Sequence, residues 1–162
     1  MKIHPAKRSD IPRIIAIFDA AKIYMRAQGN HVQWTGSYPE IAIIEKDISD
    51  GNLYVGIGND GVIHCAFSLI PGNDPTYSRI ENGQWLNNEP YFTIHRLASD
   101  GYTANVLKRC VAFSFNLTEN IRIDTHESNR TMLAALSTLG FIRCGTIYVN
   151  DGTPRIAFQK RL

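Results

Sequence analysis

The sequence has 162 residues, of which 44% are hydrophobic and 20% are charged, and its formal net charge is +2. This length predicts one domain over residues 1–162, with a core large enough to fold without disulfide or metal staples. The small net charge, with no Lys/Arg run longer than two residues, argues against a dedicated nucleic-acid binder. The N-terminal MKIHPAKRSD has no apolar leader core and no run reaches membrane-spanning length, so we expect a cytoplasmic protein without a membrane partner.

The three cysteines are odd in number, lie far apart and have apolar neighbours. This pattern is typical of buried free thiols in a reducing compartment. The three residues are Cys65, Cys110 and Cys144.

The remaining patterns alternate between strand and helix periodicity, which predicts an α/β fold with a mixed sheet and helices on both faces. Turn residues and caps set the boundaries: Ser9, the pair Ser37 and Glu40, and Ser128 or Asn129 have the chemistry of helix N-caps. In chain order we expect a strand at 1–6, helices at 9–29 and 37–51, a hairpin of strands 52–58 and 62–70, a strand at 91–97, a helix at 106–117, a strand at 120–126, a helix at 129–140, and a hairpin of strands 141–149 and 153–159.

Two connections stand out. The polar segment 71–90 is long for a loop inside a compact domain, which favours a role in lining or covering a site. The alternative is an excursion with a short extra strand at 77–80. The strand at 91–97 turns almost directly into the helix that begins at Val106, so unpaired N–H groups and the positive end of a helix dipole meet in the turn. Such a turn can hold a phosphate or be an ordinary connection.

Several of these stretches resemble the GNAT superfamily of N-acetyltransferases. The matching residues are the strand–loop–helix IHRLASDGYTANVL, the Asn129 that opens the next helix, and Leu139-Gly140-Phe141 ahead of the final hairpin. The segment IENGQWLNNEPYFTIHRLAS is similar to a bacterial branch of the family. The resemblance covers nearly the whole chain and implies a single α/β domain of the GNAT fold, whose sheet splays open between its fourth strand (91–97) and its fifth (121–126).

The resemblance further implies that acetyl-CoA is the cosubstrate, without a metal, and that its pantetheine arm enters the splay like a missing strand. Its implied contacts are the backbone of Leu97, Ala98 and Ser99 for pantetheine, and the N–H groups of Tyr102, Thr103, Ala104, Asn105, Val106 and Leu107 for the pyrophosphate. Asn129 is expected to contact the pantetheine or pyrophosphate region. Strand edges and helix starts suit an amide-rich arm and a dianion respectively.

The chain departs from the family pattern at two places. The usual loop Gln/Arg-x-x-Gly-x-Gly/Ala has Tyr102, Asn105 and Leu107 at its three defined positions. The Tyr that protonates the leaving thiolate in many relatives corresponds to Leu136, and the nearby hydroxyls of Ser137 and Tyr148 have no motif behind them. These departures leave open an alternative function, a non-catalytic acyl-CoA-binding or sensing module.

The function that the resemblance implies is transfer of an acetyl group to a primary amine of a small molecule or peptide, by direct attack in a ternary complex. His126 and His95 are the candidate catalytic residues because an imidazole suits proton transfer near neutral pH. Alternatively, His95 supports the sheet and His126 bonds Asp124 or Ser128. Residues expected on the acceptor side are Trp34, Tyr38, Tyr77 and Trp85, with Glu81 and Glu89 attracting a cationic amine; the acceptor itself is not predicted, and a homodimer is left open.

Overall fold

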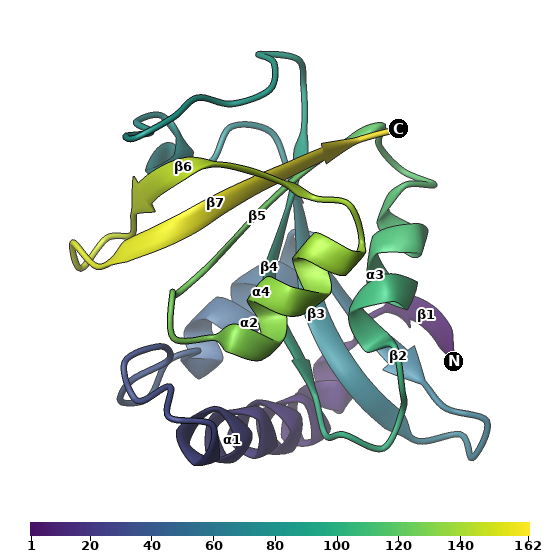
Figure 1. Cartoon of the computed structure of the whole chain (residues 1–162). Helices are drawn as coiled ribbons and strands as arrows, with labels where there is room; N and C mark the ends of the chain where they lie inside the picture. The colour runs from purple at the N-terminus through teal and green to yellow at the C-terminus, as the bar shows by residue number, and fades with distance from the viewer.

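Seven strands form one mixed sheet in the order β1-β2-β3-β4-β5-β7-β6 in the computed structural model, which describes all residues 1–162 (Figure 1). The strands are β1 (Lys2–Pro5), β2 (Leu53–Ile57), β3 (Ile63–Pro71), β4 (Phe92–Ser99), β5 (Asn120–Thr125), β6 (Ile142–Tyr148) and β7 (Pro154–Arg161). The helices are α1 (Ile11–Ala27), α2 (Ile41–Ser49), α3 (Val106–Ser114) and α4 (Arg130–Thr138), with 3-10 turns at η1 (Arg8–Asp10) and η2 (Pro75–Tyr77). The predicted α/β class is confirmed, and no helix has the length and hydropathy of a membrane span.

The sheet opens between its two parallel strands. β4 and β5 pair only at Phe92 with Ile121 and at Thr93 with Arg122, after which the two strands diverge (Figure 1). By contrast, β4 stays paired with β3 along almost its whole length. The predicted splay is therefore present, and the edge of β4 that faces β5 has no strand partner after Thr93.

A β-bulge in β4 lies beside the opening. Ala98 pairs with Ala66 and His95 pairs with Ser68, so two residues of β4 oppose one residue of β3. The two residues are Arg96 and Leu97, which lie opposite Phe67. Arg96 has a positive φ of 52°. A bulge bends its strand and increases the local twist, which turns β4 away from β5.

The Arg96 side chain joins this bulge to α2. Its Nε and Nη2 atoms donate to Asp47 Oδ2 at 3.0 and 2.5 Å, and the same oxygen accepts from Ser68 Oγ at 2.5 Å. Asp47 is buried, so its charge is matched by the guanidinium and a hydroxyl inside the protein. The unusual backbone at Arg96 is thus held by a buried ion pair.

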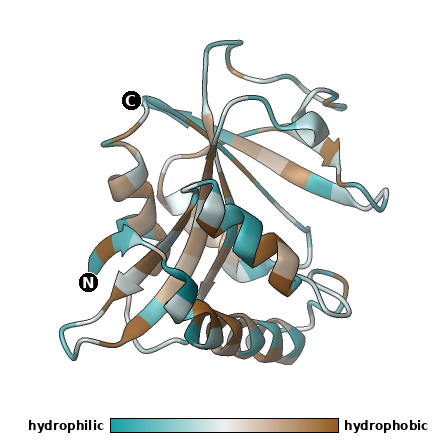
Figure 2. Ribbon diagram, turned by 180° about the vertical axis from the view of Figure 1, so that it is seen from behind, coloured by the Kyte–Doolittle hydropathy of each residue, from teal (hydrophilic) through white to brown (hydrophobic).

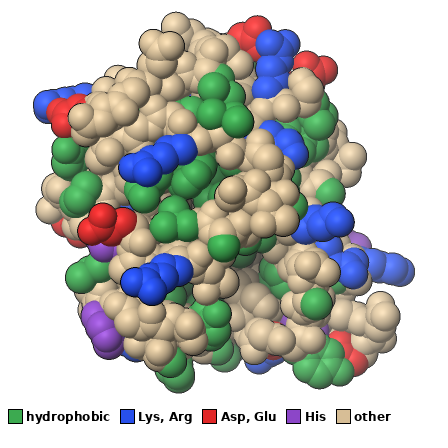
Figure 3. Space-filling model, viewed as in Figure 1, with side chains coloured by type: hydrophobic (Ala, Val, Ile, Leu, Met, Phe, Trp, Pro, Cys, Tyr) green, Lys and Arg blue, Asp and Glu red, His purple; other side chains and the backbone are tan.

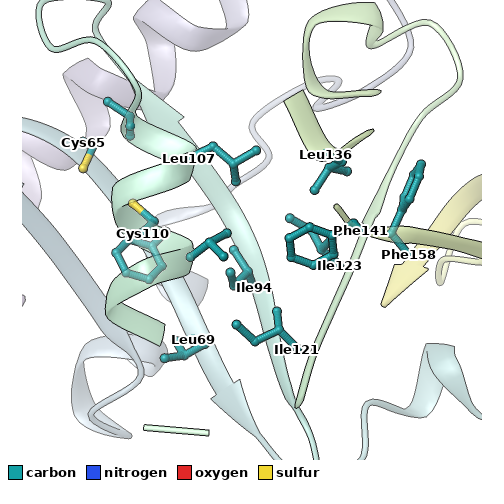
Figure 4. Close-up of a cluster of buried hydrophobic side chains, with 13 residues drawn as sticks. Cys65, Leu69, Ile94, Leu107, Cys110, Ile121, Ile123, Leu136, Phe141 and Phe158 are labelled. Carbon is teal, nitrogen blue, oxygen red and sulfur yellow. The ribbon is translucent and has the colours of Figure 1, made fainter. Parts of the chain in front are cut away.

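The two faces of the sheet have separate cores. Helices α3 and α4 pack on one face, where the cluster of Figure 4 includes Leu107, Ile123 and Leu136. On the opposite face α1 and α2 cover the N-terminal strands through residues such as Phe18 and Ile44. Figure 2 shows hydrophobic residues concentrated in the central strands while the loops are mostly hydrophilic. The prediction for the cysteines is confirmed, since all three are buried and free.

Residues 72–90 cover the second half of that opposite face. Tyr77 is buried against Tyr91 and β7, in a cluster that also receives Trp85. The guanidinium of Arg122 lies between the rings of Trp85 and Tyr91, 4.0 and 3.8 Å from their centroids. The alternative prediction of a strand at 77–80 is wrong: the segment forms η2 and one isolated bridge, between Glu81 and Thr146, because its aromatic residues turn inward to fill the core.

Two predicted helix caps are wrong and one is confirmed. Ser9 lies inside η1, which precedes α1 and is closed by the Lys7 N–H donating to Asp10 Oδ2 at 2.8 Å. Ser37 bonds only the Glu40 side chain, at 3.4 Å, and α2 begins after Glu40 without a side-chain cap. In α4, Asn129 Oδ1 accepts from the Met132 N–H at 3.2 Å, as an N-cap should.

Candidate active site

A cavity of about 830 Å³ lies where β4 and β5 diverge. Its walls come from the ends of these strands, α1 and the segment after it, the first turns of α3 and α4, residues 74–76 and the β6–β7 turn. Lys and Arg side chains are spread over the face seen in Figure 3 and do not gather into one patch. The volume and the mixed apolar and polar walls suit an organic ligand with a few fixed polar contacts.

Half of the predicted cofactor-binding residues line this cavity. Those that line it are Leu97, Ala98, Ser99, Leu107 and Asn129, and those that do not are Tyr102, Thr103, Ala104, Asn105 and Val106. The first group brings the end of β4 together with the starts of α3 and α4. The second group forms the loop just outside the cavity, where only backbone groups have been predicted to act.

The loop before α3 presents a row of free backbone donors. The N–H groups of residues 103–108 have no acceptor within the protein, and the first bonded N–H after them is that of Arg109, which donates to Asn105 O at 3.1 Å. Asn105 itself adopts the left-handed conformation with φ 58°, which Asn tolerates better than most residues. Consecutive free donors at a helix start fit a pyrophosphate, even though the loop lacks the usual glycines.

The same loop carries an acidic residue whose charge is balanced. Asp100 forms an ion pair with Arg13 and accepts from His64 Nδ1 at 2.8 Å. The hydrogen bond to Asp100 raises the pKa of His64, and it helps lower the pKa of Asp100 against the effect of burial. Tyr102 stacks on the His64 ring with centroids 4.2 Å apart. The carboxylate therefore has the Arg13 guanidinium and the His64 ring as partners within the protein.

His95 lies in the cavity between two carboxylates. Its Nε2 atom is 2.6 Å from Asp74 Oδ2, and its Nδ1 atom is 3.9 Å from Asp124 Oδ1, which also accepts from Tyr77 Oη at 2.6 Å. Burial raises the pKa of Asp74, but hydrogen bonds from His95 and Thr76 outweigh it and hold this pKa at about 2. Asp74 is thus a permanent anion that fixes the orientation of the ring.

His126 has a different environment. Its side chain does not line the cavity, and its Nδ1 atom lies 2.7 Å from Ser128 Oγ and accepts from the Ser128 N–H at 3.1 Å. Burial lowers the pKa of His126, and the positive charge of Arg155 lowers it further. The expected alternative, a bond to Ser128, is confirmed; a catalytic role for His126 stays a prediction.

The first turn of α4 is joined across the cavity mouth to the segment after α1. Asn129 Nδ2 donates to Gln33 Oε1 at 3.1 Å, and Ser128 Oγ donates to the buried Asn30 at 2.9 Å. Asn129 therefore uses both ends of its amide within the protein. Its predicted contact with acetyl-CoA stays a prediction.

The acceptor side differs from the expectation. Trp34 and Tyr38 line the cavity, and Trp34 does so with a φ of 57°, which is strained for so bulky a residue. Tyr77 and Trp85 belong to the core instead. Glu81 and Glu89 lie outside the cavity, paired with Arg79 and Arg161, so their predicted role is wrong.

Besides Arg96, Asp100 and Asp151, the cavity is lined by three further charged residues that the sequence did not single out as cavity-lining. They are Asp74, Asp124 and Arg155. The alternation of β5 carried a signal for Asp124, because it places that residue on the face shared with Arg122. Asp74 follows Gly and Asn in an irregular loop, where no periodicity could have revealed it.

No hydroxyl group occupies the position of the usual general acid. Leu136 is fully buried in the core at that place. Ser137 is exposed, and Tyr148 donates to Glu81 Oε2 at 2.9 Å, with neither of them lining the cavity. None of these three residues therefore brings a hydroxyl group to the cavity.

Solved structures of GNAT acetyltransferases share this fold. A GNAT-family acetyltransferase from Streptococcus agalactiae is 29% identical, with a TM-score of 0.90 over 99% of this chain and 95% of its own. A putative acetyltransferase from Staphylococcus aureus is 25% identical, with a TM-score of 0.70 over 99% of this chain and 99% of its own. A GNAT acetyltransferase from Listeria monocytogenes is 19% identical, with a TM-score of 0.73 over 99% of this chain and 94% of its own. No family model and no curated protein matches the sequence.

The fold and the cavity together define the class as acetyltransferase-like. The chain shares the fold of the GNAT superfamily, and the structural neighbours it resembles are mostly bacterial acetyltransferases. These neighbours support acetyl transfer as the general class of reaction.

Proposed function

We propose that the protein transfers the acetyl group of acetyl-CoA to a primary amine of a small molecule or peptide. One observation carries this proposal: a single cavity joins the unpaired edge of β4 to a histidine that is held between two carboxylates. The first feature suits the amide-rich arm of acetyl-CoA, and the second suits an amine that must lose a proton. The cavity is also large enough to hold two reacting groups side by side.

Acetyl-CoA would bind along the residues that the sequence predicts. Leu97, Ala98 and Ser99 offer backbone groups to the pantetheine amides at the open edge of β4. The six free N–H groups of residues 103–108 would hold the pyrophosphate at the positive end of α3. Because these contacts use the backbone, the absence of the family's glycines removes no donor.

His95 would act as the general base. With Nε2–H donating to Asp74, the Nδ1 atom keeps its lone pair and takes a proton from the amine. Asp124, 3.9 Å from Nδ1, stabilises the imidazolium that forms. The amine nitrogen then bonds to the thioester carbon, the carbon–sulfur bond breaks, and the CoA thiolate receives a proton from the imidazolium or from water. N–H groups at the bulge near Leu97 can stabilise the oxyanion.

The second candidate function is a non-catalytic acyl-CoA sensor. The specific observation in its favour is that buried Leu136 stands where many relatives have an acid. A sensor needs the CoA-binding contacts but no base. The two functions therefore differ in what His95 does.

The test combines binding with turnover. Acetyl-CoA binding is measured by calorimetry, and release of free thiol is followed with a broad panel of amines for the wild type, His95→Gln and His126→Gln. We expect saturable binding in all three and a loss of kcat of about 100-fold or more for His95→Gln, the typical contribution of a positioned base. A larger loss for His126→Gln would transfer the role to that residue.

Two outcomes would contradict the proposal. Tight binding of acetyl-CoA without transfer to any amine would favour the sensor. No saturable binding at millimolar acetyl-CoA would exclude both functions.

A further inference from the structure

Arg155 is a buried cation that is only partly satisfied within the protein. It is 8% exposed, it lines the cavity, and the only hydrogen bond of its side chain runs from Nη1 to the carbonyl of Pro154 at 3.1 Å. Its Nε atom lies 4.0 Å from Asp124 Oδ2, which is ion-pair distance without a hydrogen bond. Nε and Nη2 are therefore free donors, and a guanidinium this buried normally has a partner for its fork of N–H groups.

Arg155 and His95 stand on either side of the same carboxylate. The register pairs Asp124 with Ala157, so Arg155, two residues earlier on β7, is on the same face of the sheet as Asp124. His95 approaches Oδ1 of Asp124 at 3.9 Å and Arg155 approaches Oδ2 at 4.0 Å. The cavity wall thus presents, across neighbouring strands, a base, a carboxylate and a cation.

The other charged groups around this row have partners within the protein. Asp151, which also lines the cavity and whose charge interacts with that of Arg155, accepts from the N–H and the hydroxyl of Thr153. Asp74 is bound to His95 and to both the N–H and the hydroxyl of Thr76, while Arg96, the other cavity-lining guanidinium, is bound to Asp47. Arg155 is the cation in the cavity that keeps donors for a ligand. Its planar fork matches a carboxylate in a bidentate geometry.

We propose that the amine acceptor also carries a carboxylate, which Arg155 binds while the amine lies beside His95. The acceptor is thus an amino acid or a similarly small amino carboxylic acid, and Asp124 between the two sites favours its ammonium end near His95. This inference rests on the proposed transferase function and names its substrate class. A simple cationic amine would leave Arg155 unsatisfied and would be repelled by it.

The test compares acceptors that differ only in the carboxylate. Initial rates of thiol release are measured for L-tyrosine, L-tryptophan and L-histidine against tyramine, tryptamine and histamine, with phosphoethanolamine and ethanolamine as a pair that carries a different anion. The wild type, Arg155→Gln and Arg155→Lys are compared. Arg161→Gln is the matched control, because Arg161 lies on the same strand but is half-exposed and pairs with Glu89.

We expect the wild type to prefer at least one amino acid over its amine by about 10- to 100-fold in kcat/KM, as for a hydrogen bond to a charged group. Arg155→Gln should remove this preference through KM of the amino acid, leave the amine and acetyl-CoA affinity nearly unchanged, and be partly rescued by Arg155→Lys. Arg161→Gln should keep the preference.

The inference is overturned if the wild type acetylates the amines as well as the amino acids, or if Arg155→Gln slows both classes equally, which would assign the residue a structural role. The inference is also overturned if the wild type prefers phosphoethanolamine over ethanolamine but prefers none of the amino acids over its amine, because the acceptor would then carry a phosphate and not a carboxylate. Each of these results includes transfer to some amine and so leaves the proposed function standing, whereas no transfer at all would contradict that function first. The wild-type comparison decides the question even if Arg155→Gln does not fold.

Discussion

Asp74 is a single loop residue on which both the stability and the proposed chemistry depend. Its side chain is 16% exposed. Oδ1 accepts hydrogen bonds from the backbone N–H and the hydroxyl of Thr76, and Oδ2 is hydrogen-bonded to His95 Nε2. These bonds form in the folded protein and stabilise the ionised carboxylate over the protonated one. The charge of Asp74 is therefore linked to folding.

The first consequence is an acid-dependent loss of stability. The pKa of Asp74 falls from 3.8 to about 2 on folding, so its contribution is fully present above pH 4 and is lost as the pH falls through 2. That shift corresponds to about 2 kcal/mol. We expect Asp74→Asn to lower the free energy of unfolding by about this amount at pH 7 and to flatten its pH dependence between pH 4 and 2.

Urea denaturation across this pH range measures the effect. Asp19→Asn serves as the control, since the Asp19 side chain is 59% exposed and pairs only with Lys22. If Asp74→Asn and the control gave parallel curves, the carboxylate would not be coupled to folding as described.

At the level of elements, Asn129 at the start of α4 is both the cap of that helix and a residue predicted to contact acetyl-CoA. Asn129 caps the helix through Met132 and also bonds Gln33 across the cavity mouth. An N-cap replaced by Ala typically costs about 1 kcal/mol. We expect Asn129→Ala to lose about that much stability in thermal or chemical unfolding, and Asn129→Ser, which can still cap, to lose less.

The same variants test the predicted contact with acetyl-CoA. Ser137→Ala, an exposed change on the same helix, is the control for stability. Weaker acetyl-CoA binding by Asn129→Ala than by Asn129→Ser would be explained by the cap. Equal loss of affinity in both variants would instead indicate a direct contact of the amide. Unchanged stability in Asn129→Ala would contradict the capping role.

Periodicity and turn chemistry predicted the elements well because these signals are local. The hairpin at Asn59-Asp60-Gly61, the strand–helix turn ahead of Val106 and the Asn129 cap all lie within a few residues of the groups that cause them. The partners of the charged residues were not predicted, since Asp74 and His95 are 21 residues apart and Asp47 and Arg96 are 49 apart. Such pairs depend on the tertiary fold, which no spacing rule encodes.

At the scale of the whole molecule, the cavity and the cysteines are separate. None of the three thiols lines the cavity, and all lie in the interior. The hydrogen bond with Cys65, together with burial, raises the pKa of Cys110, and burial raises the pKa of Cys144. A protonated, enclosed thiol is a poor nucleophile, and although the hydrogen bond with Cys110 lowers the pKa of Cys65, that thiol also lies outside the cavity. These positions support the direct attack by the amine that we propose.

We therefore expect a variant with all three cysteines replaced by Ala, and shown to be folded by circular dichroism, to keep kcat within about threefold of the wild type. Its melting temperature will fall because each replacement leaves a small cavity in the core. Intact-protein mass spectrometry after mixing with acetyl-CoA alone should show no acetylated enzyme. An acetyl adduct on wild type that is absent from the variant would establish an acyl-enzyme.

Residues 72–90 contribute both to the core and to the cavity, and this double role limits how the segment can change in evolution. The segment covers the Arg122 guanidinium with Trp85 and, near its start, supplies the Asp74 carboxylate that orients His95. An insertion or deletion in this segment would change both the packing of the core and the orientation of the His95 ring. Selection for a sound fold and selection for a substrate consequently fall on the same stretch of chain, so its length is less free to drift than that of an ordinary surface loop.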